Sequence, residues 1–449
     1  MKIWEKGQCV DPDMMGFTIG DDKKYDLQLA PHDIMASAAH AHMLAKVGLI
    51  GQEESLCVIQ ALEAMHTECL EGYFALRESV EDVHSEIEAR LIEEQGDAGK
   101  KIHTARSRND QVLVALKLFY RHELLAIIDE LQELIVILLR RSNEHAHDLL
   151  PGYTHMQVAM PSSFGLWFGA YAEGLIDDLE QMKGVFQFVN RNPLGSAAGY
   201  GSSFPINRSY TGELLAFDGM HVNVVYAQMS RGKTERLLAG FMASLGATLG
   251  KWAQDTCLYQ SQNFGFISLP DELTTGSSIM PHKKNPDIIE LIRGECALLQ
   301  ALPSQVTLLL QNMPSGYHRE VQLLKGVVMP AMARLRAVLR MSARAVAAMQ
   351  VVKNLMNDQR YALAFSVENV NQKVLNGATF RDAYREVASD IAAGTFEPQT
   401  SLNHTHEGSL GNLMNEVLGY RLSSVVDGFE TQKYEEWKRG FWLRLHSAS

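Results

Sequence analysis

The stretch "SRNDQVLVALKLFYRHELLAIIDELQELIVILLRRSNEHAH", residues 107–147, is the longest helical pattern in this chain of 449 residues. It contains neither glycine nor proline, and its apolar residues recur at steps of three and four, which is the period of an α-helix. Proline and glycine follow just past its end. An unbroken helix of this length extends over roughly 60 Å. Helices this long are typical of bundles, so the stretch predicts a helical bundle.

Four more helical patterns follow along the chain, at 161–190, 224–262, 287–313 and 330–352. We expect a bend in the third of these at Pro303, because proline cannot donate the hydrogen bond of the helix ladder. No segment between the patterns alternates apolar and polar residues in the manner of strands. The five patterns together predict an all-α fold.

The remaining sequence indicates a division into three domains. Residues 107–352 form the central five-helix bundle domain. Residues 1–106 and 353–449 contain shorter helical patterns and more turns. We therefore predict an N-terminal and a C-terminal small helical domain, one at each end of the long bundle.

Composition and charge exclude several classes of protein. Hydrophobic residues make up 46% and charged residues 21%, as in ordinary soluble domains. The formal net charge of -12 argues against a nucleic-acid or membrane partner, since both require a basic surface. No apolar stretch is long enough to span a bilayer, and the start lacks the pattern of a signal peptide. Five scattered cysteines without a CxxC pair predict reduced thiols and a cytoplasmic protein.

Two polar, glycine-rich segments separate the long helices, at 192–208 and within 265–286. The second contains "TTGSSIMPHKKNPD", residues 274–287. Connectors of this length inside a compact fold are more often functional or disordered than simple links between helices. Its hydroxyl, amide and ammonium donors suit a ligand that carries carboxylates. Gly276 would allow the loop to fold over such a ligand.

The stretch "HTARSRNDQ", residues 103–111, lies where the longest helix begins. The start of a helix presents free N–H groups and a positive potential, so anions collect there. We therefore expect an anion-binding role for residues at this point, namely Arg106, Arg108 and Asn109.

Histidines occur in three other short stretches. "PGYTHMQ", residues 151–157, places Thr154 and His155 just past the end of the longest helix. A single histidine is more often structural than catalytic. The histidines at 144–147 and 404–408 lack the HExxH order and a third ligand at helical spacing, so no metal site is predicted.

Three of these motifs, in this order, resemble one protein family. "GSSIMPHKKNPD" is similar to the signature loop of the fumarase/aspartase superfamily, whose usual form is GSSxMPxKxNP. "KIHTARSRNDQV" and "PGYTHMQ" resemble the other two signature regions in the form typical of argininosuccinate lyases. The resemblance extends from about residue 20 to about residue 352 and is weaker in the C-terminal part.

The resemblance implies a fold, an assembly and a reaction. The fold would be of the fumarase/aspartase type, in a homotetramer whose core contains twenty helices, five from each chain. The reaction would be the reversible elimination of fumarate from argininosuccinate to give arginine, a step of arginine biosynthesis. It needs neither a metal nor an organic cofactor, and each active site would be shared between chains.

The resemblance also assigns catalytic residues. Ser277 would be the catalytic serine of a mobile lid and His155 its partner, supported by Glu290. We expect Ser277 to be the base at the succinyl carbon and His155 the acid toward the leaving nitrogen, although the sequence leaves the opposite assignment open. Lys283 would stabilise the charge that develops in the reaction.

The predicted substrate-binding residues fall into two groups. One group would hold the fumaryl carboxylates together with Lys283: Arg108, Asn109, Thr154, Ser278 and Asn285. The other would hold the amino-acid end of the substrate: Tyr317, Gln322 and Lys325. His84, in "EDVHSEIEARL", matches a further histidine that lines the site in the family.

The sequence departs from the family pattern around the amine half of the substrate. The usual segment SDRDF reads "MSRGK" here, which keeps Arg231 and replaces two acids with Ser230 and Gly232. The usual QEDKE reads "QLLKG", and Asp22 stands where the family commonly has a substrate-binding serine. Two alternatives therefore stay open: a related lyase that acts on a different N-substituted succinate, and a structural, crystallin-like protein on the same fold.

Overall fold

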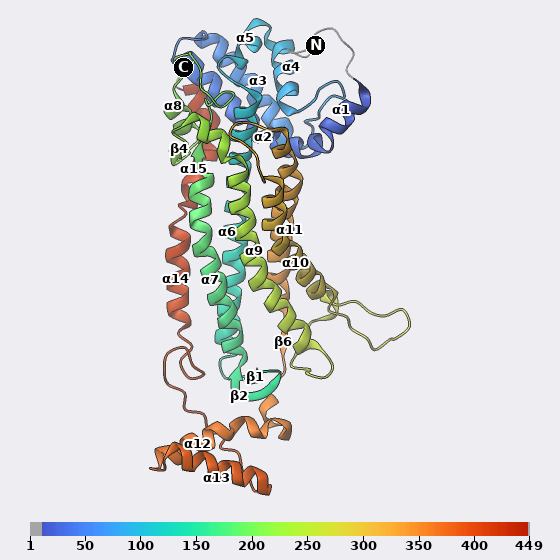
Figure 1. Cartoon of the computed structure of the whole chain (residues 1–449), viewed down its shortest axis with the longest axis vertical. Coiled ribbons are helices and arrows are strands. Elements are labelled where there is room, and N and C mark those ends of the chain that lie inside the picture. The colour runs from blue at the N-terminus through green and yellow to red at the C-terminus, as the bar shows by residue number, and fades with distance from the viewer. Residues whose placement is uncertain (1–10, 448–449) are drawn as a thin grey trace.

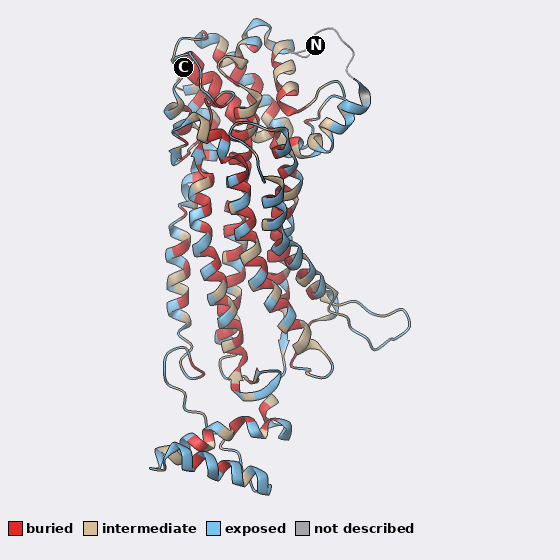
Figure 2. Ribbon diagram, in the orientation of Figure 1, coloured by how far each residue is buried: buried red, intermediate tan, exposed pale blue. Residues whose placement is uncertain are grey.

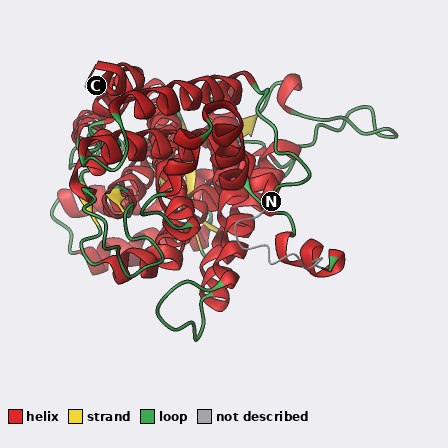
Figure 3. Cartoon of the chain, turned by 90° about the horizontal axis from the view of Figure 1, so that it is seen from above, coloured by secondary structure: helices red, strands yellow, loops and turns green. Residues whose placement is uncertain are grey.

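The computed structural model describes residues 11–447 and shows an elongated bundle of helices (Figure 1). The long helices run side by side along its length and carry few strands between them, so the all-α prediction is confirmed (Figure 3). The bundle consists of α6 (Arg108–Glu144), α7 (Phe164–Val189), α9 (Val224–Gln260), α10 (Asp287–Leu309) and α11 (Leu324–Ala348).

Helix α6 is unbroken over its 37 residues, as its sequence predicts. Ser107 caps its start by accepting a hydrogen bond from the Asn109 N–H, and the Asp110 side chain in turn accepts one from the Ser107 N–H. The second oxygen of Asp110 accepts from the N–H groups of Gly195 and Ala197, which fixes the loop after α7 against the start of α6. A helix of this length spans about 56 Å.

The core runs along the inner faces of the long helices, where the buried residues of Figure 2 lie. On α6, Leu124, Ile127 and Leu131 are fully buried, one helical turn apart. Each such side chain contributes about 1.5–3 kcal/mol when it leaves water. This stripe holds α6 against α7, α11 and α2 (Asp22–Lys46).

The second helix of the bundle begins later than the sequence pattern suggests. Residues 161–163, which we expected at its start, belong to strand β2 (Gln157–Ser163). This strand pairs with β1 (Leu149–Thr154) in an antiparallel hairpin. The Ser163 side chain then caps α7 by accepting from the Leu166 N–H.

Two other helices differ from their sequence patterns. Helix α10 continues through Pro303, the position of the expected bend. Helix α11 begins at Leu324, earlier than 330. The break in helical geometry falls instead in α9, where Arg231 and Gly232 have non-helical backbone angles.

The N-terminal helices cover the upper end of the bundle in Figure 1. They comprise α1 (Pro12–Ile19), α2, α3 (Gln52–Glu71), α4 (Val83–Gln95), α5 (Asp97–Lys100) and the short 3-10 helix η1 (Lys101–His103). Helix α2 contacts α3 on one side and α6 on the other. The same end also holds α8 (Arg208–Leu214) and the parallel pair of β3 (Arg191–Asn192) and β4 (Gly219–Met220).

The C-terminal part leaves the bundle and then returns to it. After the 3-10 helices η4 (Leu355–Asn357) and η5 (Gln359–Phe365), α12 (Ser366–Leu375) and α13 (Phe380–Ala393) pack together at the lower end (Figure 1). Helix α14 (Asn415–Asp427) then runs along α6 and α7, and α15 (Thr431–Ser447) contacts α2 and α3. Residues 353–447 therefore do not all lie at one end, and the boundaries of the three domains stay a prediction.

Several smaller features complete the fold. Strands β5 (Ile267–Ser268) and β6 (Gln350–Val351) pair in antiparallel fashion near the lower end, and the 3-10 helices η2 (Asp271–Leu273) and η3 (Arg319–Leu323) lie before α10 and α11. Between residues 11 and 447, no helix combines the length and apolarity that a membrane span requires. The four cysteines in this part of the chain are unpaired, and Cys9 lies outside it.

Candidate active site

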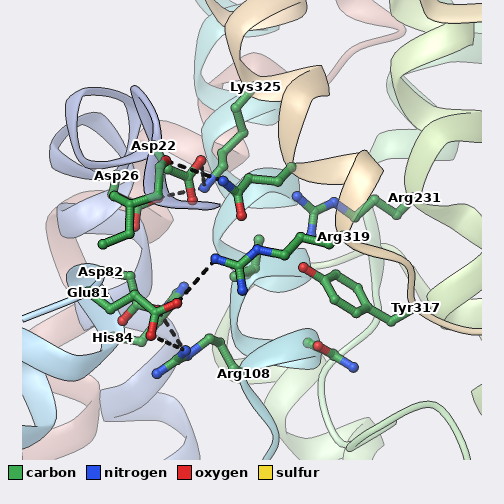
Figure 4. Close-up of a pocket in the computed structure, with 14 residues that line it drawn as sticks. Asp22, Asp26, Glu81, Asp82, His84, Arg108, Arg231, Tyr317, Arg319 and Lys325 are labelled. Atoms are coloured by element: carbon green, nitrogen blue, oxygen red, sulfur yellow. Dashed lines mark hydrogen bonds and ion pairs between the residues drawn. The ribbon is translucent and has the colours of Figure 1, made fainter. Parts of the chain in front are cut away.

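A polar pocket lies at the upper end of the bundle, where α2, α6, α9 and the segment before α11 meet (Figure 4). Six of the predicted substrate-binding residues line it, although they are spread over 241 positions of the sequence, from 84 to 325: His84, Arg108, Asn109, Tyr317, Gln322 and Lys325. The structure thus brings together the residues predicted for the amino-acid end and two of those predicted for the fumaryl end.

Lys325 is the most deeply buried cation of this pocket. Its Nζ lies 2.6 Å from Asp22 Oδ1 and 2.7 Å from Asp26 Oδ1. The two carboxylates stand one helical turn apart at the start of α2, so both face Lys325. Burial raises the pKa of the Asp22 carboxyl above its ordinary value, against the lowering effect of Lys325.

Arg108 extends from the first turn of α6 into the pocket. Its Nε lies 2.9 Å from Asp82 Oδ2 and its Nη1 3.5 Å from Glu81 Oε2. Glu81 also pairs with Arg319, at 3.2 Å, so that a chain of ion pairs crosses the pocket (Figure 4). Burial would raise the pKa of the Asp82 carboxyl, but His84 and Arg108 outweigh it and lower that pKa.

His84 is buried at the start of α4, with its Nδ1 3.0 Å from Asp33 Oδ2. Burial alone would lower the pKa of its imidazole, but the carboxylates of Asp33, Asp82 and Asp26 outweigh this effect and raise the pKa. Its Nε2 has no hydrogen-bond partner among residues 11–447. His84 therefore lines the pocket with one ring nitrogen fixed by Asp33 and the other without a protein partner in this part of the chain.

The break in α9 turns Arg231 into the pocket. Gly232 has a φ of 83°, a conformation that residues with a Cβ adopt only at a cost. A Cβ at this position would lie 2.4 Å from Leu310 Cδ2, so the replacement of an acid by glycine also permits close packing here. Glu235 accepts a hydrogen bond from the Gly232 N–H and one from the Tyr120 hydroxyl, and thereby holds the turn.

Thr154 and His155 lie at the opposite end of α6, at the tip of the β1–β2 hairpin (Figure 1). Both side chains are exposed. His155 and Met156 form the two-residue turn, with φ values of 53° and 59°. Such turns favour asparagine and glycine, so the hairpin presents His155 at some conformational cost.

The loop 274–286 projects from the start of α10 and is the long extension at the side of Figure 1. Thr275 and Asn285 exchange backbone hydrogen bonds of 3.1 and 2.8 Å and close its base. Within the loop, Ser277 Oγ accepts from the N–H of Met280 at 3.1 Å. Lys283 is exposed, while Lys284 pairs with Asp271.

The structure therefore does not gather all of the predicted site residues in one chain. Ser277, Ser278, Lys283 and Asn285 stand on the projecting loop, and Glu290 is exposed in the first turn of α10. Helix α10 has 23 residues, about 35 Å, and separates this loop from Tyr317 and the pocket. His155 is separated from Arg108 by the whole of α6.

Sequence reasoning missed four charged residues that line the pocket, namely Asp26, Glu81, Asp82 and Arg319. Signals in the sequence could have pointed to two of them, Asp26 and Asp82. Asp26 follows Asp22 at a spacing of four, which places both on one helix face. Asp82 caps α4 by accepting from the Ser85 N–H, and an acid before a helical pattern is a recognisable cap.

Sequence comparison links the chain to a family of lyases. Residues 7–300 match the profile of a family described as Lyase. An argininosuccinate lyase of Parabacteroides distasonis is 52% identical over 435 residues, which cover 97% of this chain and 98% of that protein. An argininosuccinate lyase of Phocaeicola vulgatus is 50% identical over 98% of each chain. That of Thermotoga neapolitana is 38% identical over 86% of this chain and 97% of its own.

Solved structures with the same fold are more distant in sequence. EDDS lyase in complex with formate has a TM-score of 0.68 and 20% identity, with 98% of this chain and 94% of that chain covered. A class II fumarase from Schistosoma mansoni has a TM-score of 0.68 and 17% identity, with 90% of each chain covered. These likenesses confirm the expected fumarase-like fold.

Proposed function

The chain belongs to the argininosuccinate lyases, a family of carbon-nitrogen lyases, and from this premise we propose that it cleaves argininosuccinate reversibly into arginine and fumarate. The observation that carries the proposal is the identity of 52% over 97% of the chain and 98% of the relative. The likeness is not confined to one motif, since it includes the bundle, the loop and the pocket. The step serves arginine biosynthesis, and the cysteine pattern favours the cytoplasm as its compartment.

The reaction requires the kinds of residue that these motifs supply. Elimination begins with removal of a proton beside a carboxylate, which creates a doubly charged aci-carboxylate. Fixed cations and hydrogen-bond donors must stabilise this charge as it develops. The loop 274–286 provides such groups in Lys283, Asn285 and Ser278.

Ser277 acts in this proposal as the base at the succinyl carbon, and His155 as the acid toward the guanidino nitrogen that leaves. An ordinary serine is a poor base, so closure of the loop must exclude water and bring positive charge near Ser277. Glu290 supports His155, and Thr154 with Arg108 and Asn109 completes the hold on the fumaryl carboxylates. The position of the half-buried Ser277 on a projecting loop supports a lid of this kind.

We propose that the enzyme is a homotetramer whose sites are shared between chains. A single chain keeps the hairpin and the loop away from the pocket, because α6 separates the hairpin from it by about 56 Å and α10 separates the loop from it by about 35 Å. Antiparallel packing of identical bundles would bring the upper end of one chain beside the lower end of another. Exposed apolar residues on α10, including Leu291, Leu298 and Leu308, support such an interface.

The test is direct. Purified protein is mixed with argininosuccinate, and the ultraviolet absorbance of fumarate is followed over time. Production of fumarate and arginine in equal amounts is the expected result. Fumarate release from another N-substituted succinate alone would show a related lyase. No turnover of any such substrate would favour the structural, crystallin-like protein.

Lys283→Met should lower kcat as well as weaken substrate binding. The ammonium group stabilises the dianionic intermediate more than the ground-state carboxylate, so its loss raises the barrier of the chemical step. We expect a decrease of about 100-fold in kcat, which corresponds to about 2.7 kcal/mol. Steady-state kinetics with argininosuccinate measure it.

The matched control is Lys284→Met, in the same loop. Lys284 is engaged by Asp271 rather than directed to a ligand, so this variant should keep kcat within about threefold, or about 0.7 kcal/mol. A Lys283 variant in which only KM rises would identify the lysine as a simple anchor and contradict the assigned role.

A further inference from the structure

The charges that line the pocket are not all matched by fixed partners. Glu81 and Asp82 are paired with Arg108 and Arg319 through contacts of 2.9–3.5 Å. Lys325 is paired with two carboxylates. Arg231, in contrast, has no carboxylate within ion-pair distance in the part of the chain that the structure describes.

Asp22 is the surplus anion of this pocket. Lys325 carries one positive charge, and the fully buried Asp26 is a sufficient partner for it. Asp26 is further fixed by the Val83 N–H, which donates to its second oxygen at 3.2 Å. One lysine between two aspartates leaves a net charge of -1, and Asp22 is the more exposed of the two, with 15% of its side chain accessible against 1% for Asp26.

Arg231 is the surplus cation. Its guanidinium is buried, with 8% of the residue exposed, and lies 5.9 Å from the centre of the Tyr317 ring. One nitrogen donates to the Val321 carbonyl at 3.2 Å, but Nε has no partner among the described residues. A buried donor without a partner carries a desolvation cost that a ligand acceptor would relieve.

We propose that Asp22 is a specificity-determining residue that binds the α-ammonium group of the amino-acid half of the substrate, with Arg231 facing the α-carboxylate. This inference rests on the proposed function and deepens it. A surplus anion and a surplus cation on the walls of one pocket complement the two charges of an α-amino acid (Figure 4). Lys325, which lines the same pocket, also holds Asp22 in place.

The consequence is selectivity for a free α-amino group. A site with a net negative charge of this kind rejects an analogue that lacks the ammonium group, because the second carboxylate beside Lys325 is then left without a counter-charge in a desolvated pocket. A serine at this position would leave no net charge behind and would discriminate less. The presence of aspartate where the family commonly has serine predicts a stricter requirement for the ammonium group in this enzyme.

The reverse reaction provides the test, because fumarate can be offered with different guanidino compounds. Arginine is compared with 5-guanidinopentanoate, which lacks the α-ammonium, and with agmatine, which lacks the carboxylate. We expect the wild type to favour arginine over 5-guanidinopentanoate by at least about 100-fold in kcat/KM. In Asp22→Asn and Asp22→Ser this preference should fall below about 10-fold. The preference for arginine over agmatine in kcat/KM should change by less than about threefold.

The matched control is Asp21→Asn, which removes an exposed carboxylate from the adjacent position and should leave both preferences unchanged. A wild type that treats arginine and 5-guanidinopentanoate within about fivefold of each other would overturn the proposal, whether or not the variants fold. Unchanged preference in folded Asp22 variants would overturn it as well.

Calorimetric measurement of the binding of these three guanidino compounds separates this inference from the proposed function. An enzyme that binds arginine at least about 100-fold more tightly than 5-guanidinopentanoate, yet forms no argininosuccinate, would retain the subsite and refute the reaction. Turnover of argininosuccinate without selectivity for the ammonium group would retain the reaction and refute the role of Asp22.

Discussion

Ser277→Ala is expected to abolish turnover while the protein stays folded. Loss of a positioned base lowers kcat by about 100- to 10,000-fold. The hydroxyl accepts hydrogen bonds only within its own exposed loop, so its removal should reduce the free energy of unfolding by no more than about 1.5 kcal/mol. The measurements are kcat with argininosuccinate and the thermal unfolding midpoint.

Binding of the products distinguishes loss of catalysis from disturbance of the site. Fumarate and arginine should still raise the unfolding midpoint of the variant, because ligands that bind the folded state stabilise it. A variant that kept more than about a tenth of the wild-type kcat would have lost only about 1.4 kcal/mol of barrier stabilisation. That result would show that Ser277 is not the base.

Two inactive variants should restore activity to each other when they share a tetramer. His155→Asn and Ser277→Ala are unfolded together in equal amounts and allowed to reassemble at random. If one chain supplies the histidine and another the serine, about a quarter of the sites receive both residues intact, since each is intact with a chance of one half. Activity should return toward about a quarter of the wild-type value.

The control for this experiment combines Ser277→Ala with Lys283→Met. Both residues stand on the loop 274–286 of one chain, so every site receives a loop with at least one defect and no activity above the parents should return. Mixed tetramers of the first pair that remain as inactive as the parents would mean that His155 and Ser277 serve a site from the same chain. The shared-site proposal would then be wrong.

Some structural features follow from residues that are neighbours in the sequence, and others do not. The start of α6 follows from the capping residues Ser107 and Asp110, and its length follows from a regular apolar stripe. Both features depend only on residues that are close together in the sequence. The exposed loop around Ser277 was likewise evident from a composition that no helix would keep. In contrast, the start of α7 was placed three residues early, because pairing of β2 with β1 captured residues 161–163.

The amino-acid sequence by itself determined the all-α class, the long helices, the polar loop and the motifs of the lyase family. Only the tertiary structure decided which side chains meet: that Lys325 lies between Asp22 and Asp26, and that the turn at Gly232 aims Arg231 into their pocket. It also decided that α14 and α15 return along the bundle. The physical reason is the distance along the sequence between the residues that interact. Helical periodicity and capping arise from residues within a few positions of each other, whereas Asp22 and Lys325 come together only when α2 and α11 pack, and that packing depends on the whole core.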